Sequence, residues 1–133
     1  MLLFQGLESW GLLVLRVFLG AIFIYHGLPK LSMPASMAKG MGKSTGFVAV
    51  LGFFEFVAGL ALILGFYVEI AAIVTSIVML GALYHKMFKW KTPFFAMDKT
   101  GWEFDFALLG MAVAVLFLGS GSISLDSLFG LFP

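Results

Sequence analysis

The chain has 133 residues, of which 62% are hydrophobic and 11% are charged, and its formal net charge is +1. A soluble domain carries charge on about 25% of its residues, so this chain has too little polar surface to cover itself in water. The small net charge argues against a nucleic-acid partner. The absence of cysteine excludes thiol redox chemistry, disulfides and thiolate-bound metals. The lipid bilayer is therefore the expected solvent and the first expected partner.

Four long apolar stretches follow one another, each close to the roughly 20 residues that a membrane-spanning helix needs. We expect spans over residues 11–28, 47–64, 69–88 and 102–118. The first should be a retained helix, because it lacks a basic start and a convincing cleavage site. Pro29 is expected to end it, since proline cannot continue the helical hydrogen-bond ladder. The predicted fold is all-α: an integral membrane four-helix bundle in up-down-up-down order, with residues 1–133 forming a single domain.

The connectors differ in charge and so predict an orientation. Met33, Met37 and Met41 recur at helical spacing in the 31–46 connector, which suits either a short amphipathic helix on the membrane surface or a solvated loop. Lysines gather in or beside this connector and the 89–99 connector, whereas the turn at 65–67 and the tail have none. The positive-inside rule makes the basic connectors cytoplasmic and places both termini outside.

Two similar phrases suggest an internal repeat. Tyr25-His26 closes the first span and Tyr84-His85 closes the third, and each is followed by a basic connector and a helix with acidic residues. The chain is either two copies of one hairpin, related by an axis along the membrane normal, or an apolar sequence with chance similarity.

Polar side chains from all four spans are expected at one level of the membrane. Glu55 lies about 12 Å below the cytoplasmic end of its span, at about 1.5 Å per residue. A carboxylate at that depth must face the bundle interior, find a partner or stay protonated. His26 and His85 lie within a turn of the same end of their helices. We predict that Glu55, His26 and His85 handle protons or bind a ligand.

The start of the fourth span completes this predicted site. Trp102, Glu103 and Asp105 lie in its first turn, and we expect them to contribute to ligand binding without a metal ion. Structural explanations stay open beside this one. Thr100 and Glu103 fit a capping box, Asp105 complements the helix dipole, and the histidines suit an interfacial aromatic belt.

Other charged residues and the glycines are expected to be structural. Lys30 should anchor its helix by extending to the lipid headgroups. Arg16 either pairs with Glu69 near the outer face or extends to the headgroups by itself. Glycines seven residues apart should let the first two spans pack closely: Gly20 and Gly27 on the first, and Gly52 and Gly59 on the second.

Quinone is the cofactor that this set of residues suits best. Quinones partition into the bilayer, and aromatic walls, histidine donors and a proton-exchanging acid fit their chemistry. Haem b held by His26 and His85 has no supporting motif. The Glu-x-x-His motif of di-iron bundle sites is absent.

Several short motifs occur in one characteristic order: Leu15-Arg16, Tyr25-His26-Gly27-Leu28-Pro29-Lys30, Phe54-Glu55-Phe56-Val57-Ala58-Gly59, the histidine that ends the third span, Gly101-Trp102-Glu103-Phe104-Asp105, and Gly119-Ser120-Gly121-Ser122-Ile123-Ser124-Leu125-Asp126. In this order the chain resembles the DoxX-like family of small four-helix membrane proteins. The resemblance implies a multi-pass protein of a bacterial or archaeal inner membrane. Relatives include subunits of a thiosulfate–quinone oxidoreductase and partners of superoxide dismutase and sulfurtransferase, and more distant ones are eukaryotic cargo receptors and receptor-assembly chaperones.

Two functions therefore stay open, since this fold occurs in enzymes and non-enzymes. The first is a small subunit of a membrane redox system, either a quinone-linked oxidoreductase or an oxidative-stress complex, with a membrane or soluble redox protein as partner. The alternative is a non-catalytic scaffold or assembly factor that docks a partner protein on the basic face. A proton-coupled transporter is a third, more distant reading, and four spans would then call for a homo-oligomer.

Overall fold

The computed structural model describes residues 3–131, and every regular element within them is helical. The long helices are α1 (Glu8–Ser32), α3 (Thr45–Leu64), α4 (Val68–Tyr84) and α5 (Trp102–Leu118). Two short helices, α2 (Pro34–Met41) and α6 (Leu125–Phe129), follow α1 and α5, and a π-helical turn, η1 (His85–Lys89), extends α4. The predicted all-α class is confirmed.

Within residues 3–131, three helical segments are long and apolar enough to cross a membrane: α1, α3, and α4 together with η1, Val68–Lys89. The α5 helix has 17 residues. Large apolar side chains such as Phe18, Phe117 and Leu118 are more than 60% exposed. An apolar surface of this kind is stable against lipid tails and unstable in water, so the chain is a multi-pass membrane protein.

The predicted glycine stripes join α1 to α3. A Cβ atom on Gly20 would lie 2.5 Å from the carbonyl oxygen of Gly59, and one on Gly27 would lie 2.8 Å from that of Gly52. The four glycines therefore form two reciprocal contacts where the antiparallel backbones touch. Such close approach maximises dispersion contacts between helices in a solvent that supplies no hydrophobic force.

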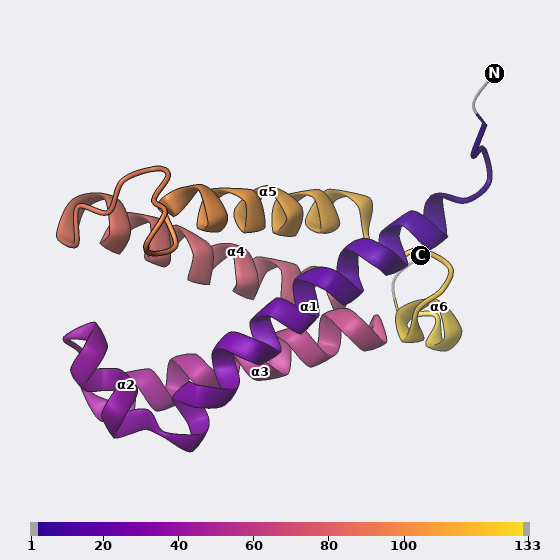
Figure 1. Cartoon of the computed structure of the whole chain (residues 1–133). Helices are drawn as coiled ribbons and strands as arrows, with labels where there is room; N and C mark the ends of the chain where they lie inside the picture. The colour runs from indigo at the N-terminus through magenta and orange to yellow at the C-terminus, as the bar shows by residue number, and fades with distance from the viewer. Residues whose placement is uncertain (1–2, 132–133) are drawn as a thin grey trace.

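The long helices form two hairpins. α1 packs mainly on α3, and α4 packs mainly on α5. The hairpins meet near α6 and diverge toward the end that carries α2 and the 90–101 loop (Figure 1). The two hairpins share a hydrophobic core that includes Leu19, Phe23, Leu62, Met79 and Leu108.

The first connector differs from the prediction at the end of α1 and agrees with it in α2. α1 continues through Pro29 to Ser32, so the expectation that Pro29 ends the helix is wrong. Proline costs one backbone hydrogen bond, and here it lies in the last turn, where the Met33 amide donates to the Pro29 carbonyl at 2.8 Å. The amphipathic helix that the methionine spacing suggested forms as α2.

The expected Arg16–Glu69 pair is wrong. Arg16 is fully buried and donates to the carbonyl oxygens of Leu62 at 3.1 Å and Ile123 at 2.5 Å. Carbonyls at the end of a helix lack intrahelical donors, so the guanidinium gains more by bonding Leu62 than by reaching Glu69, which is exposed.

The C-terminal tail closes the same end of the molecule. Asp126 of α6 accepts hydrogen bonds from the amides of Tyr67 at 2.7 Å and Val68 at 2.9 Å, and so caps the start of α4. Its own amide donates to the carbonyl of Gly65 at 2.8 Å. The tail thus fixes the turn between the hairpins and leaves their other ends free to diverge.

Candidate ligand-binding site

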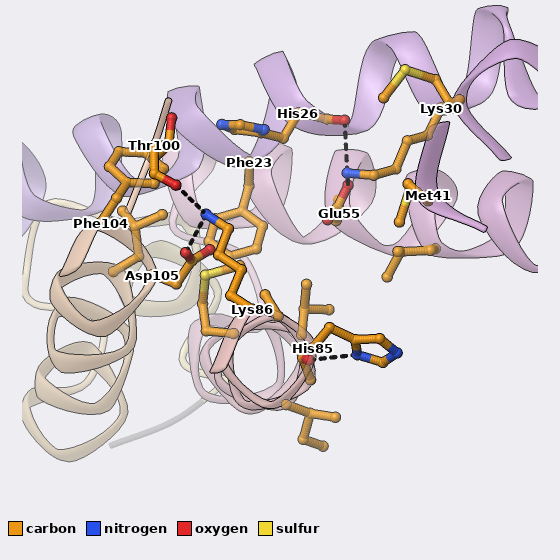
Figure 2. A pocket seen from close by; sticks show the side chains of 18 of the residues that line it. Phe23, His26, Lys30, Met41, Glu55, His85, Lys86, Thr100, Phe104 and Asp105 are labelled. Carbon is orange, nitrogen blue, oxygen red and sulfur yellow. Dashed lines mark hydrogen bonds and ion pairs between the residues drawn. The ribbon is translucent and has the colours of Figure 1, made fainter. Parts of the chain in front are cut away.

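A cavity of about 500 Å³ lies between the diverging hairpins. Its walls are mainly apolar and include Phe23, Leu51, Ile77, Phe104 and Leu108. The polar side chains gather at one level, at the end of the hairpins near α2 (Figure 2). A mostly apolar cavity with a few convergent polar groups is the usual form of a small-molecule site.

Lys30 and Glu55 form a buried ion pair on the α1–α3 hairpin. Lys30 Nζ lies 2.6 Å from Glu55 Oε2 and also donates to the His26 carbonyl at 3.1 Å. The side chains are only 9% and 5% exposed. The expectation that Lys30 extends to the headgroups is therefore wrong, because an ionised Glu55 at this depth needs a counter-charge more than Lys30 needs water.

Lys86 and Asp105 form a second ion pair on the α4–α5 hairpin. Lys86 Nζ lies 2.5 Å from Asp105 Oδ2, and its second contact is the Thr100 carbonyl oxygen at 3.5 Å. Lys86 belongs to the π-helical turn η1, in which the Trp90 amide donates to the His85 carbonyl at 2.7 Å. Single π turns are rare and occur often at functional sites.

The two histidines occupy different positions. The His26 ring lies between the two ion pairs in Figure 2 and tilts against Phe104 at a ring-centroid distance of 6.0 Å. The His85 ring leaves its helix in a different direction from Lys86 (Figure 2), with Nδ1 2.8 Å from the Gly81 carbonyl. A carbonyl can only accept, so Nδ1 carries a proton and Nε2 is left for a ligand. Both histidines line the cavity, and His26 is the one beside both ion pairs.

The first turn of α5 contributes less than expected. Trp102 packs on Phe94 at a centroid distance of 4.5 Å, and the Glu103 amide donates to the Phe94 carbonyl at 3.1 Å. Neither Trp102 nor Glu103 belongs to the described residues that line the cavity. Trp102 and Glu103 therefore hold the 90–101 loop against α5, beside the site.

The expected capping box at Thr100 is wrong. α5 begins at Trp102, its N-cap residue is Gly101, and no side chain accepts a capping hydrogen bond there. A Cβ atom on Gly101 would overlap the Phe94 backbone, so the loop crosses here and its carbonyls receive the first amides of the helix. Thr100 lines the cavity instead.

Sequence reasoning missed the two lysines as parts of the site. Lys30 lies one helical turn after His26, and Lys86 directly follows His85. Each lysine therefore accompanies one of the repeated Tyr-His phrases, and each pairs with an acid on the helix that follows in its hairpin. The recurrence of a lysine near each Tyr-His phrase, with an acidic residue on the next long helix, is the sequence signal that indicates these two ion pairs. No group of three or more His, Asp or Glu side chains within residues 3–131 is placed to hold a metal ion.

The DoxX family profile matches residues 11–90. The chain belongs to the DoxX family. The matched part of this DoxX protein contains most of α1 and all of α2 to η1, with His26, Lys30, Glu55, His85 and Lys86. Asp105 and the capping residue Asp126 lie beyond it. Comparison with curated proteins and with solved structures gives no match.

Proposed function

We propose that this DoxX protein is a small subunit of a membrane redox system and binds a quinone in the cavity between its hairpins. The observation that carries the proposal is the placement of His26 and the Lys86–Asp105 pair on the wall of an apolar cavity of about 500 Å³. A quinone has an apolar ring and two carbonyl acceptors. The cavity offers aromatic and aliphatic walls for the ring, and donors on both hairpins for the carbonyls.

The residues present fit such a ligand in chemistry as well as in size. When bound, a quinone supplies two-electron chemistry that takes up or releases protons, with electrons from a partner oxidoreductase. The His26 imidazole can both donate and accept a proton and lies at the cavity surface, so it is suited to exchange a proton with the ligand. Glu55 forms an ion pair with Lys30 and so balances the charge of that lysine.

The proposal includes the membrane arrangement. α5 is the fourth span, which gives a four-helix bundle in up-down-up-down order. The cavity end carries the exposed lysines Lys39, Lys43, Lys89, Lys91 and Lys99, and the positive-inside rule places that end in the cytoplasm of a prokaryotic inner membrane, with both termini outside. A soluble redox partner would meet the protein on this basic face.

The test is purification in a mild detergent, followed by an absorption spectrum, metal analysis and lipid extraction. The proposal expects quinone at a near-stoichiometric level, and loss of that quinone in His26→Ala with an unchanged melting temperature. Protein that carries no quinone and does not take it up from added micelles would contradict the proposal.

A scaffold that docks a partner protein is the second candidate. It is favoured by the pairing of both lysines within their own hairpins, since two satisfied ion pairs are sufficient to hold the helices without any ligand. In that case a partner protein would copurify without quinone. Glu55→Gln would then lower the melting temperature and leave the turnover of that partner unchanged.

A further inference from the structure

We propose that Lys86 is the residue that determines ligand specificity, and that it selects a ring bearing an ionised hydroxyl group. The inference rests on the proposed quinone site. It distinguishes two ion pairs that look alike in sequence: Lys30–Glu55 is structural, and Lys86–Asp105 is the pair that meets the ligand.

The two lysines differ in how fully their donors are used. Lys30 has a contact of 2.6 Å to Glu55 and a normal hydrogen bond of 3.1 Å to a backbone carbonyl. Lys86 has one short contact to Asp105 and a second one, at 3.5 Å, at the outer limit for a hydrogen bond. The Lys86 side chain is 17% exposed against 9% for Lys30. Lys86 thus has donor capacity left on the cavity wall.

The position of Lys86 adds a second argument. It lies on the π-helical turn, whereas Lys30 lies on a regular α-helix that is packed through glycines against α3. An irregular turn can change its backbone geometry at lower cost than a helix held by close backbone contacts. Lys86 can therefore turn an unused N–H toward a ligand while it keeps its contact with Asp105, whose carboxylate is buried like that of Glu55.

The charge of the cavity favours an anionic ligand. Lys30, Lys43 and Lys86 line it together with only two carboxylates, Glu55 and Asp105. One positive charge is uncompensated before either histidine is protonated. An ionised ring hydroxyl would balance that charge, and its bond to an ammonium would be stronger than one from a neutral carbonyl.

Two naphthoquinones test this inference, because they differ in a single ring substituent. Lawsone carries a hydroxyl that is ionised at neutral pH, and menadione carries a methyl group. Affinity is measured by quenching of tryptophan fluorescence in a neutral detergent, with a soluble tryptophan derivative in the same micelles as the optical correction. Trp90 lines the cavity and serves as the reporter.

We expect the unaltered protein to bind lawsone more tightly than menadione. Lys86→Gln should lower the ratio of the two affinities by about tenfold, while Lys86→Arg keeps most of it. Asp105→Asn should raise the ratio, because Lys86 then has no competing anion. Lys39→Gln changes an exposed lysine of the same basic face that does not line the cavity, so it is the matched control and should keep the ratio.

The outcomes separate this inference from the proposed function. Binding of both quinones without preference contradicts the role of Lys86 and leaves the quinone site standing. Binding of neither contradicts both. Lys43 lines the cavity at its exposed rim. If Lys43→Gln abolishes the preference for lawsone and Lys86→Gln keeps it, Lys43 is the selecting residue and the inference is wrong. A lower ratio of lawsone to menadione affinity in Asp105→Asn would also overturn the inference.

Discussion

Lys30 Nζ lies 2.6 Å from Oε2 of Glu55, and this contact joins α1 to α3 beside the cavity. Both residues are more than nine-tenths buried. Removal of one partner from such a pair leaves an unbalanced buried charge, which costs about 3–5 kcal/mol.

We therefore expect Lys30→Gln to lower the free energy of unfolding in detergent by about 3 kcal/mol or more. The double variant Lys30→Met with Glu55→Leu should recover most of that loss, because no charge remains to be paired. Chemical unfolding followed by circular dichroism measures both. A double variant as unstable as Lys30→Gln would contradict this expectation, because stability would then depend on the ion pair and not on the absence of an unpaired buried charge.

The close approach of Gly20 to Gly59 predicts a large effect from a small side chain. Gly20→Ala would place a methyl group 2.5 Å from the Gly59 carbonyl oxygen, so the helices must separate. We expect a loss of about 1–3 kcal/mol, as for overpacked cores. Gly110→Ala is the control: this helical position in α5 has open space around it, so alanine should be neutral or slightly stabilising there. Equal effects of the two substitutions in a melting experiment would contradict the packing.

The contacts of Arg16 predict which residues hold the C-terminal tail. Arg16→Gln should release the 119–131 segment, because one guanidinium bonds both Leu62 and Ile123. Limited proteolysis from the side that carries the tail should then cut this segment faster. Glu69→Gln should leave the cleavage rate unchanged. Faster cleavage in Glu69→Gln would restore the pair that the sequence suggested.

The capping carboxylate of Asp126 predicts a separate effect on α4. Asp126→Ala leaves the Tyr67 and Val68 amides without these acceptors, and loss of a cap costs about 1–2 kcal/mol. Asp126→Asn should lose less, because one side-chain oxygen remains. Asp98→Asn, in the exposed 90–101 loop, is the matched control and should not change the melting temperature.

The proposed orientation predicts where reporters are active. A reporter fused after residue 133 should be active only outside the cytoplasm, and one inserted in the 90–101 loop only inside it, because lysines concentrate at the cavity end. Activity of both reporters in one compartment would mean that α5 does not cross the membrane. The reverse pattern would place the cavity end outside.

The site could be predicted in part. Sequence reasoning brought His26, Glu55, His85 and Asp105 to one level, because helix rise converts position in a span into depth. It placed Trp102 and Glu103 beside them for the same reason, yet neither lines the cavity. Depth does not determine the direction of a side chain around the helix, which depends on how the neighbouring helices pack.

The sequence alone determined the solvent, the helical class and the glycine contacts between α1 and α3. These features depend on composition and on regular spacing, which are local properties of the chain. Only the tertiary structure decided the partners of Lys30, Lys86 and Arg16. A long charged side chain reaches several positions with similar cost, so its final contact is set by whichever buried acceptor the fold brings within range.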